Sequence, residues 1–244
     1  MPTSKVAIIT GSSRGIGAAI AQKVASNGIN VVINFTSDEA GAAKTLELVR
    51  ASGSDGLCLK ADVTKKDQVT TMFQKAKEKF GRIDYLVNNA GILTYSPIAD
   101  LSEEDFDRMF AINVKGTLFC CQLACQHMED GGSIVNVSSS TTMYMLPNYG
   151  CYVASKGAVE QLTRSLSREV ASRGIRVNVV SPGPVDTELF RAGKSDEQIK
   201  RFEQLSAFNR LGQPEDIANV VAFLLSDDSK WMTAQNVRAN GGTA

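Results

Sequence analysis

Short apolar segments recur along the chain, and the residues between them are spaced as on helices. These segments are continuously hydrophobic and rich in β-branched residues, which is typical of strands that are covered on both faces of a sheet. They span residues 6–10, 31–35, 56–61, 83–88, 133–138, 175–180 and 236–239. Strands that alternate with helices favour right-handed βαβ crossovers, so the pattern predicts an α/β fold with a doubly wound parallel sheet.

The helical pattern predicts helices at about residues 15–28, 38–52, 65–80, 103–127, 150–173 and 214–226. No linker, repeat or low-complexity tract interrupts the series, so we expect residues 1–244 to form a single domain. Residues 184–210 interrupt the alternation of strands and helices, because they are polar and contain one capping box, from Ser195 to Gln198. Long excursions at the carboxyl ends of strands often enclose ligands. We therefore interpret 184–210 as a substrate lid, with a plain surface excursion as the alternative.

Charge and composition narrow the class of protein. The 26 basic and 26 acidic residues leave no net charge, which argues against electrostatic binding of nucleic acid or of an anionic membrane over a broad surface. The first apolar stretch is shorter than the apolar region of a signal peptide, and no segment approaches the length of a membrane span. We expect a soluble, cytoplasmic protein.

Cysteine and histidine usage argues against disulfides, zinc and a serine-hydrolase triad. The five cysteines include no Cys-x-x-Cys pair, and an odd number favours free thiols. His127 is the only histidine, and its neighbours show no nucleophile elbow. We therefore expect chemistry without a metal.

A glycine-rich turn follows the first predicted strand, with Gly11, Gly15 and Gly17 in the spacing Gly-x-x-x-Gly-x-Gly. Free backbone N–H groups and the helix dipole at such a turn attract a nucleotide's phosphates. Glycines also serve tight turns and helix packing, so the motif gains weight only from its place after a strand. It predicts a dinucleotide site that also includes Ser13, Arg14 and Ile16.

The end of the second strand bears on which dinucleotide binds. A carboxylate there would hold the free ribose hydroxyls of NAD(H), but the chain has Thr36 and Ser37, and Asp38 is better explained as a helix cap. Arg14 adds a cation at a helix N-terminus, where it opposes the dipole unless an anion lies near. These residues favour NADP(H) over NAD(H), although Arg14 can also be a solvated arginine.

Tyr152 and Lys156 lie one helical turn apart, shortly after a serine cluster at 138–140. Reduction of a ketone needs a proton at oxygen as well as a hydride at carbon, and Tyr152 is our candidate acid. Lys156 and an oxidised nicotinamide would lower the phenol pKa from about 10 by about three units. The same ammonium can hold the nicotinamide ribose. An ordinary exposed Tyr–Lys pair is the alternative reading.

The chain resembles the short-chain dehydrogenase/reductase family over essentially its whole length. The matching elements occur in the family's order and include the Thr10–Gly17 turn, Asn88-Asn89-Ala90-Gly91, Tyr152-x-x-x-Lys156 and Pro182-Gly183-x-x-x-Thr187. The resemblance implies a Rossmann-type sheet of seven strands and, commonly, a homotetramer. It also implies that NAD(P)(H) lies across the carboxyl ends of the strands.

The resemblance assigns further residues to the cofactor. It places Asp62 and Val63 at the adenine, Asn89, Ala90 and Gly91 at the adenosine side, and Pro182, Gly183, Val185 and Thr187 at the nicotinamide. From the residues alone, Asp62 can equally end a strand and cap a helix, and the segment from Asn88 to Gly91 can be a plain turn.

The resemblance also implies roles around the proton donor. Ser139 would orient the carbonyl oxygen, because the family's serine usually precedes the tyrosine by thirteen positions, with Ser138 and Ser140 as second choices. Asn113 would sit at a backbone distortion and hold a water that links Lys156 to solvent. From the residues alone, Asn113 is a polar residue in helix packing.

Among family members the chain is similar to 3-oxoacyl-[acyl-carrier-protein] reductases and related NADPH-dependent carbonyl reductases. Arg173 keeps one basic docking position, but residues 127–131 are acidic where those reductases are basic, which makes acyl carrier protein a doubtful partner. We expect a small carbonyl or alcohol substrate in a mostly apolar pocket. The alternatives are an NAD-dependent alcohol dehydrogenase and a non-catalytic dinucleotide sensor. Candidate pocket residues are Met143, Tyr144, Met145, Leu146, Tyr149, Leu189, Phe190 and Phe202.

Overall fold

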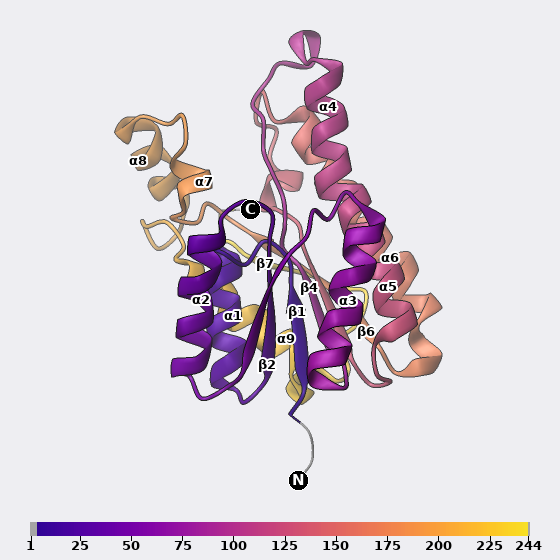
Figure 1. Ribbon diagram of the computed structural model, residues 1–244. Helices are drawn as coiled ribbons and strands as arrows, with labels where there is room; N and C mark the ends of the chain where they lie inside the picture. The colour runs from indigo at the N-terminus through magenta and orange to yellow at the C-terminus, as the bar shows by residue number, and fades with distance from the viewer. Residues whose placement is uncertain (1–3, 244) are drawn as a thin grey trace.

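The computed structural model describes residues 4–243, which form one sheet of seven parallel strands in the order β3-β2-β1-β4-β5-β6-β7 (Figure 1). Each predicted apolar segment contributes one strand, so the sequence-based fold is confirmed. The strands are β1 (Val6–Ile9), β2 (Asn30–Phe35), β3 (Gly56–Lys60), β4 (Tyr85–Asn88), β5 (Ser133–Val137), β6 (Arg176–Pro182) and β7 (Asn236–Ala239).

Helices cover both faces of this sheet. On one face α1 (Gly15–Ser26), α2 (Glu39–Ala51) and α9 (Pro214–Leu225) pack around Ile20, Val49 and Ile217. On the other face α3 (Lys66–Phe80) and α5 (Thr117–His127) pack around Phe73 and Cys120. The helix α6 (Gly150–Glu169) joins this second layer (Figure 1). Burial on both faces explains why the strands are uniformly apolar.

The strand order reverses next to β1, which pairs with β2 on one side and with β4 on the other. The crossovers on either side of this point run in opposite directions, so the carboxyl ends of β1 and β4 open a crevice where ligands bind in such sheets. The glycine turn, residues 89–91 and Ser139 all follow strands at this edge.

The helix predicted at 103–127 is divided into three parts. It begins as α4 (Glu103–Phe110), continues as a π-helical segment at Ala111–Gly116 and ends as α5. In Figure 1, α4 rises beyond the carboxyl edge of the sheet. A π-helical insertion widens the turn, which is the form of the backbone distortion expected at Asn113.

Residues 184–210 contain two short helices, α7 (Glu188–Arg191) and α8 (Asp196–Leu205). The predicted capping box opens α8, with the Ser195 hydroxyl accepting from Gln198 N at 3.3 Å and the Gln198 side chain accepting from Ser195 N at 2.9 Å. Every helix within residues 4–243 is too short or too polar to span a bilayer. Short 3-10 turns lie at Ile98–Asp100, Ser140–Met143, Ala171–Arg173 and Asp227–Ser229.

Thr10 joins the ends of β1 and β4, where the crevice opens. Its buried hydroxyl accepts from the backbone N–H groups of Asn89 and Ala90, each at 3.0 Å. The side-chain amide of Asn89 in turn donates hydrogen bonds to the carbonyls of Thr10 and Gly11, at 3.0 and 2.9 Å. One threonine therefore fixes the loop after β4 against the glycine turn.

We expect Thr10→Val to lower the free energy of unfolding by roughly 1–3 kcal/mol, because it leaves two N–H donors without an acceptor. Denaturant titration measures this value. Thr71→Val is the matched control, since Thr71 is exposed on α3 and bonds only to the carbonyl of Asp67 in its own helix. Equal losses in the two variants would contradict the role given to Thr10.

Candidate active site

A cavity of about 990 Å³ runs across the carboxyl edge of the sheet, from the glycine turn to Tyr152. Every residue predicted to contact the cofactor lines it, so the structure brings together positions that span most of the sequence. They are Gly11, Ser13, Arg14, Gly15, Ile16, Gly17, Thr36, Ser37, Asp62, Val63, Asn89, Ala90, Gly91, Tyr152, Lys156, Pro182, Gly183, Val185 and Thr187.

The glycine turn is shaped for close approach of a ligand to the backbone. Gly11 and Gly15 have φ values of 60° and 56°, in the left-handed region that favours glycine. At Gly17 a Cβ would lie 2.4 Å from the Gly11 carbonyl oxygen and 2.6 Å from the Asn89 amide nitrogen, so glycine is needed there for α1 to pack against the turn and Asn89. The turn that results places the N-terminus of α1 at the cavity, where it fits a dinucleotide's phosphates.

At the adenosine end of the cavity, two hydroxyl residues follow β2 before the first carboxylate. Thr36, Ser37 and Asp38 line the cavity, and Asp38 also caps α2 by accepting from Gly41 N at 3.0 Å, as the sequence predicted. Arg14 pairs with Glu188 of α7 at 3.3 Å, with both side chains largely exposed. Exposed ion pairs contribute little to stability, so Arg14 can leave Glu188 and pair with a phosphate instead.

Asp62 and Asn89 each make a structural hydrogen bond and also line the cavity. The Asp62 carboxylate accepts from Thr64 N at 2.9 Å, which is a local turn interaction, while Asp62 also lines the cavity. Asn89 supports the glycine turn through its amide and lines the same cavity. A structural role and a cofactor contact are therefore compatible at both positions.

Lys156 is a buried cation at the opposite end of the cavity, with only 4% of its surface exposed. Its Nζ donates to the Val137 carbonyl at the end of β5 at 2.9 Å and lies 5.7 Å from the centre of the Tyr152 ring. Burial lowers the pKa of Lys156 to about 8. The ammonium form therefore predominates only below that pH.

The groups of the protein by themselves do not lower the pKa of Tyr152, and the expected lowering included the charge of an oxidised nicotinamide. Burial raises the pKa of Tyr152 to about 12, and a hydrogen bond with Ser139 opposes this rise without cancelling it. Desolvation disfavours the phenolate more strongly than the groups of the protein favour it. Tyr152 consequently carries its proton at neutral pH, which is the form that an acid needs.

The three clustered serines point in different directions. Ser138 donates to the Glu160 carboxylate at 2.8 Å, and Ser140 donates to the Ser181 carbonyl at 3.0 Å. The Ser139 hydroxyl accepts from the Thr141 hydroxyl at 2.9 Å, lines the cavity, and acts to lower the pKa of Tyr152. Of these three, Ser139 is therefore the hydroxyl that faces Tyr152.

Asn113 lies behind the cavity rather than on its wall. It is 1% exposed and sits in the π-helical segment. Its amide bonds to both backbone groups of Ile92, at 2.9 and 3.0 Å, and donates to Ser155 at 3.0 Å. A Cβ at Gly91 would lie 3.3 Å from both the Asn113 Oδ1 and the Lys156 Nζ, which shows how close the three groups are.

Two of the predicted pocket residues do not line the cavity. Met143 and Met145 are 55% and 101% exposed, because the 3-10 turn after Ser139 points them outward. The sequence analysis missed Tyr95 and Arg108, which no apolar pattern or motif marks. The pocket residues confirmed in the lining are Tyr144, Leu146, Tyr149, Leu189, Phe190 and Phe202.

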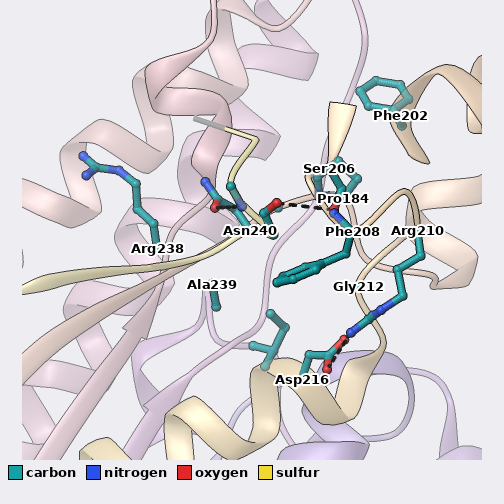
Figure 2. Close-up of a pocket in the computed structure, with 14 residues that line it drawn as sticks. Pro184, Phe202, Ser206, Phe208, Arg210, Gly212, Asp216, Arg238, Ala239 and Asn240 are labelled. Atoms are coloured by element: carbon teal, nitrogen blue, oxygen red, sulfur yellow. Dashed lines mark hydrogen bonds and ion pairs between the residues drawn. The ribbon is translucent and has the colours of Figure 1, made fainter. Parts of the chain in front are cut away.

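A second cavity of about 310 Å³ adjoins the first and shares Gly183, Pro184 and Phe202 with it. Figure 2 shows Phe208 and Asn240 lining it and the Arg210 guanidinium paired with Asp216, at 2.6 Å. The positive charge of Arg210 is therefore balanced by Asp216 in the lining of this second cavity.

Arg173 is held by its own chain. Its guanidinium donates to the Asp130 carboxylate at 2.7 Å and to the carbonyls of Cys125 and Met128, at 2.6 and 2.5 Å. These bonds close the end of α5 and give Arg173 a structural role. Arg173, which the sequence suggested as a basic docking position for acyl carrier protein, is therefore bound by groups of its own chain. Within residues 4–243, the side chains of His, Cys, Asp and Glu form no cluster that could hold a metal ion.

Comparison with known proteins identifies the family. Residues 11–244 match the family model described as enoyl-(acyl carrier protein) reductase. The chain is 42% identical over 248 residues to a short-chain type dehydrogenase/reductase of Picea abies, covering 98% of this chain and 92% of that protein. The protein belongs to the short-chain dehydrogenase/reductase family.

Two further relatives carry more specific descriptions. A chloroplastic NADPH-dependent aldehyde reductase-like protein of Arabidopsis thaliana is 39% identical, covering 98% of this chain and 93% of that protein. The solved structure of the angucycline C-6 ketoreductase LanV with bound NADP is 39% identical, with a TM-score of 0.92 and coverage of 98% of this chain and 95% of that chain. The NADP in that structure agrees with the cofactor predicted from the sequence.

The lowered pKa of Lys156 predicts how oxidoreductase turnover at this site depends on pH. The ammonium is present below about pH 8 and is lost as the pH rises through that value, so kcat/KM should fall above about pH 8. Initial rates with NADPH between pH 6 and pH 10 measure the profile. A flat profile up to pH 10 would show that Lys156 does not act as a cation.

Proposed function

We propose that the protein is an NADPH-dependent reductase of small ketones or aldehydes, with Tyr152 as the proton donor. The observation that carries this proposal is the meeting of Ser139, Tyr152 and Lys156 at one end of a cavity whose other end is the glycine turn. A proton source and a dinucleotide cradle on one cavity are the parts that carbonyl reduction requires.

Preference for NADP(H) rests on the adenosine end of the cavity. Thr36, Ser37 and an exposed Arg14 suit a 2′-phosphate, and Asp38 is engaged as a helix cap. The ketoreductase LanV, which binds NADP, supports the same choice. An NAD-dependent alcohol dehydrogenase is the alternative, and the intact Tyr152–Lys156 pair argues against a non-catalytic sensor.

In the proposed mechanism the reduced nicotinamide supplies a hydride to the carbonyl carbon. Ser139 and Tyr152 donate hydrogen bonds to the carbonyl oxygen and fix its position. Tyr152 then transfers its proton as negative charge develops on that oxygen. The Lys156 ammonium stabilises the resulting phenolate and can hold the nicotinamide ribose, while the Val137 carbonyl keeps it in place.

The apolar lining supports a small hydrophobic substrate. Leu146, Phe190 and Phe202 offer little that would bind a charged carrier, and Arg173 is engaged within its own chain. A 3-oxoacyl group on acyl carrier protein is therefore less favoured than a free ketone. LanV has also been solved with rabelomycin, which is consistent with a free small molecule. A homotetramer, a cytoplasmic location and the lid role of residues 184–210 stay predictions.

We expect Tyr152→Phe to reduce kcat at least 100-fold, since general-acid catalysis contributes on the order of 10²–10⁴. The phenyl ring keeps the packing, so NADPH affinity should change little. Steady-state kinetics with a simple ketone and calorimetric titration with NADPH measure the two quantities. Near-normal turnover in this variant would refute Tyr152 as the acid.

Arg14→Ala should weaken NADPH binding by about tenfold, because a charge-assisted bond to the 2′-phosphate is lost. NADH has no such phosphate, so its affinity should be unchanged. Lys44→Ala is the control, since Lys44 is an exposed cation on α2 away from the cavity lining. Equal losses for NADPH and NADH would indicate general damage to the glycine turn.

A further inference from the structure

Tyr95, Tyr149 and Lys194 form a continuous wall beside the proton donor, which we call the aromatic wall. The rings of Tyr95 and Tyr149 meet edge to face, with their centres 5.0 Å apart, and the Tyr149 ring lies 6.5 Å from that of Tyr152. Both Tyr95 and Tyr149 line the cavity. The wall therefore borders the space in which a carbonyl next to Tyr152 must lie.

Lys194, in the turn between α7 and α8, fixes the outer end of the wall. Its ammonium donates to the Tyr95 hydroxyl and to the Phe190 carbonyl, each at 2.5 Å. It also lies 4.8 Å from the centre of the Tyr95 ring and 4.4 Å from that of Phe190. One cation thus ties the segment 184–210 to the loop after β4, 99 residues away in the sequence.

The aromatic wall meets the cavity with two phenol rings, and Lys194 holds the hydroxyl of one of them. The Tyr95 hydroxyl accepts from Lys194, while burial, together with the neighbouring Tyr95 side chain, raises the pKa of Tyr149, so Tyr149 is a neutral phenol. The wall therefore offers a ligand mainly ring surface, whose quadrupole favours another ring packed edge to face or offset. Among the hydroxyls that line the cavity, the proposed mechanism assigns the carbonyl oxygen to those of Ser139 and Tyr152.

We propose that the aromatic wall determines specificity and selects carbonyl compounds with a flat aromatic ring fused or joined to the carbonyl carbon. This proposal rests on the carbonyl reductase function and names its substrate class. Tyr95 and Tyr149 contact the ring, and Lys194 is a positioning residue that acts through Tyr95. An aromatic pair contributes about 0.5–1.5 kcal/mol beyond area burial, which corresponds to a preference of roughly twofold to tenfold.

The test compares 1-tetralone with 1-decalone, two bicyclic ketones of similar size that differ in the aromatic ring. Calorimetry measures their affinities for the full-length protein saturated with NADP⁺, so the readout does not require turnover. The wild-type protein should bind 1-tetralone roughly twofold to tenfold more tightly. Equal affinities, or no measurable binding of either ketone, would overturn the proposal. Binding with this preference but without NADPH-driven reduction would contradict only the reductase function.

Variants of the wall separate ring contact from positioning. Tyr149→Leu should abolish the preference while leaving the affinity for 1-decalone unchanged. Tyr95→Phe and Lys194→Met should each reduce it, and the double variant should be no worse than Lys194→Met alone, because both changes remove the bond between Lys194 and Tyr95. Lys200→Met is the control on the same segment, since Lys200 is exposed on α8. A preference for 1-tetralone that survives in Tyr149→Leu, or additive losses in the double variant, would contradict the roles given to the aromatic wall.

Discussion

A positive charge buried at Lys156 constrains the structure around the active site. Burying an ammonium is unfavourable unless hydrogen bonds replace its water, so the fold must deliver acceptors to it. The carboxyl end of β5 provides the Val137 carbonyl, and Gly91, which the Asn113 side chain also approaches, lies beside the same nitrogen. The end of β5 and the loop after β4 thus both adjoin the Lys156 ammonium.

This arrangement explains features that local propensity does not. A π-helical segment weakens a helix, yet it brings the Asn113 side chain to the loop after β4, where it bonds both backbone groups of Ile92. Gly91 leaves room where a side chain would crowd Lys156. Burial raises the pKa of Tyr152 to about 12 but lowers that of Lys156 only to about 8, and both groups therefore carry their protons near neutral pH.

Local pattern predicted the fold well, because each strand is a continuous apolar segment and each parallel crossover has one favoured hand. The glycine turn and the Tyr152–Lys156 pair could also be recognised from the sequence, since each lies within a few consecutive residues. The choice of Ser139 came from family resemblance, and only the side-chain directions of Ser138 and Ser140 explain it. Met143 and Met145 were assigned to the pocket wrongly because composition does not reveal which way a 3-10 turn faces. Tyr95 and Lys194 left no signal, because their contact joins residues far apart in the chain.

The central claim is that this cavity transfers a hydride from NADPH to a carbonyl carbon. It is tested most directly with NADPH that carries deuterium at the transferring position of the nicotinamide ring, using mass spectrometry of the alcohol formed from a simple aryl ketone. The alcohol should carry one deuterium on the carbinol carbon, in step with the NADPH consumed. Alcohol without the label, or NADPH bound but never oxidised with any ketone or aldehyde, would contradict the claim.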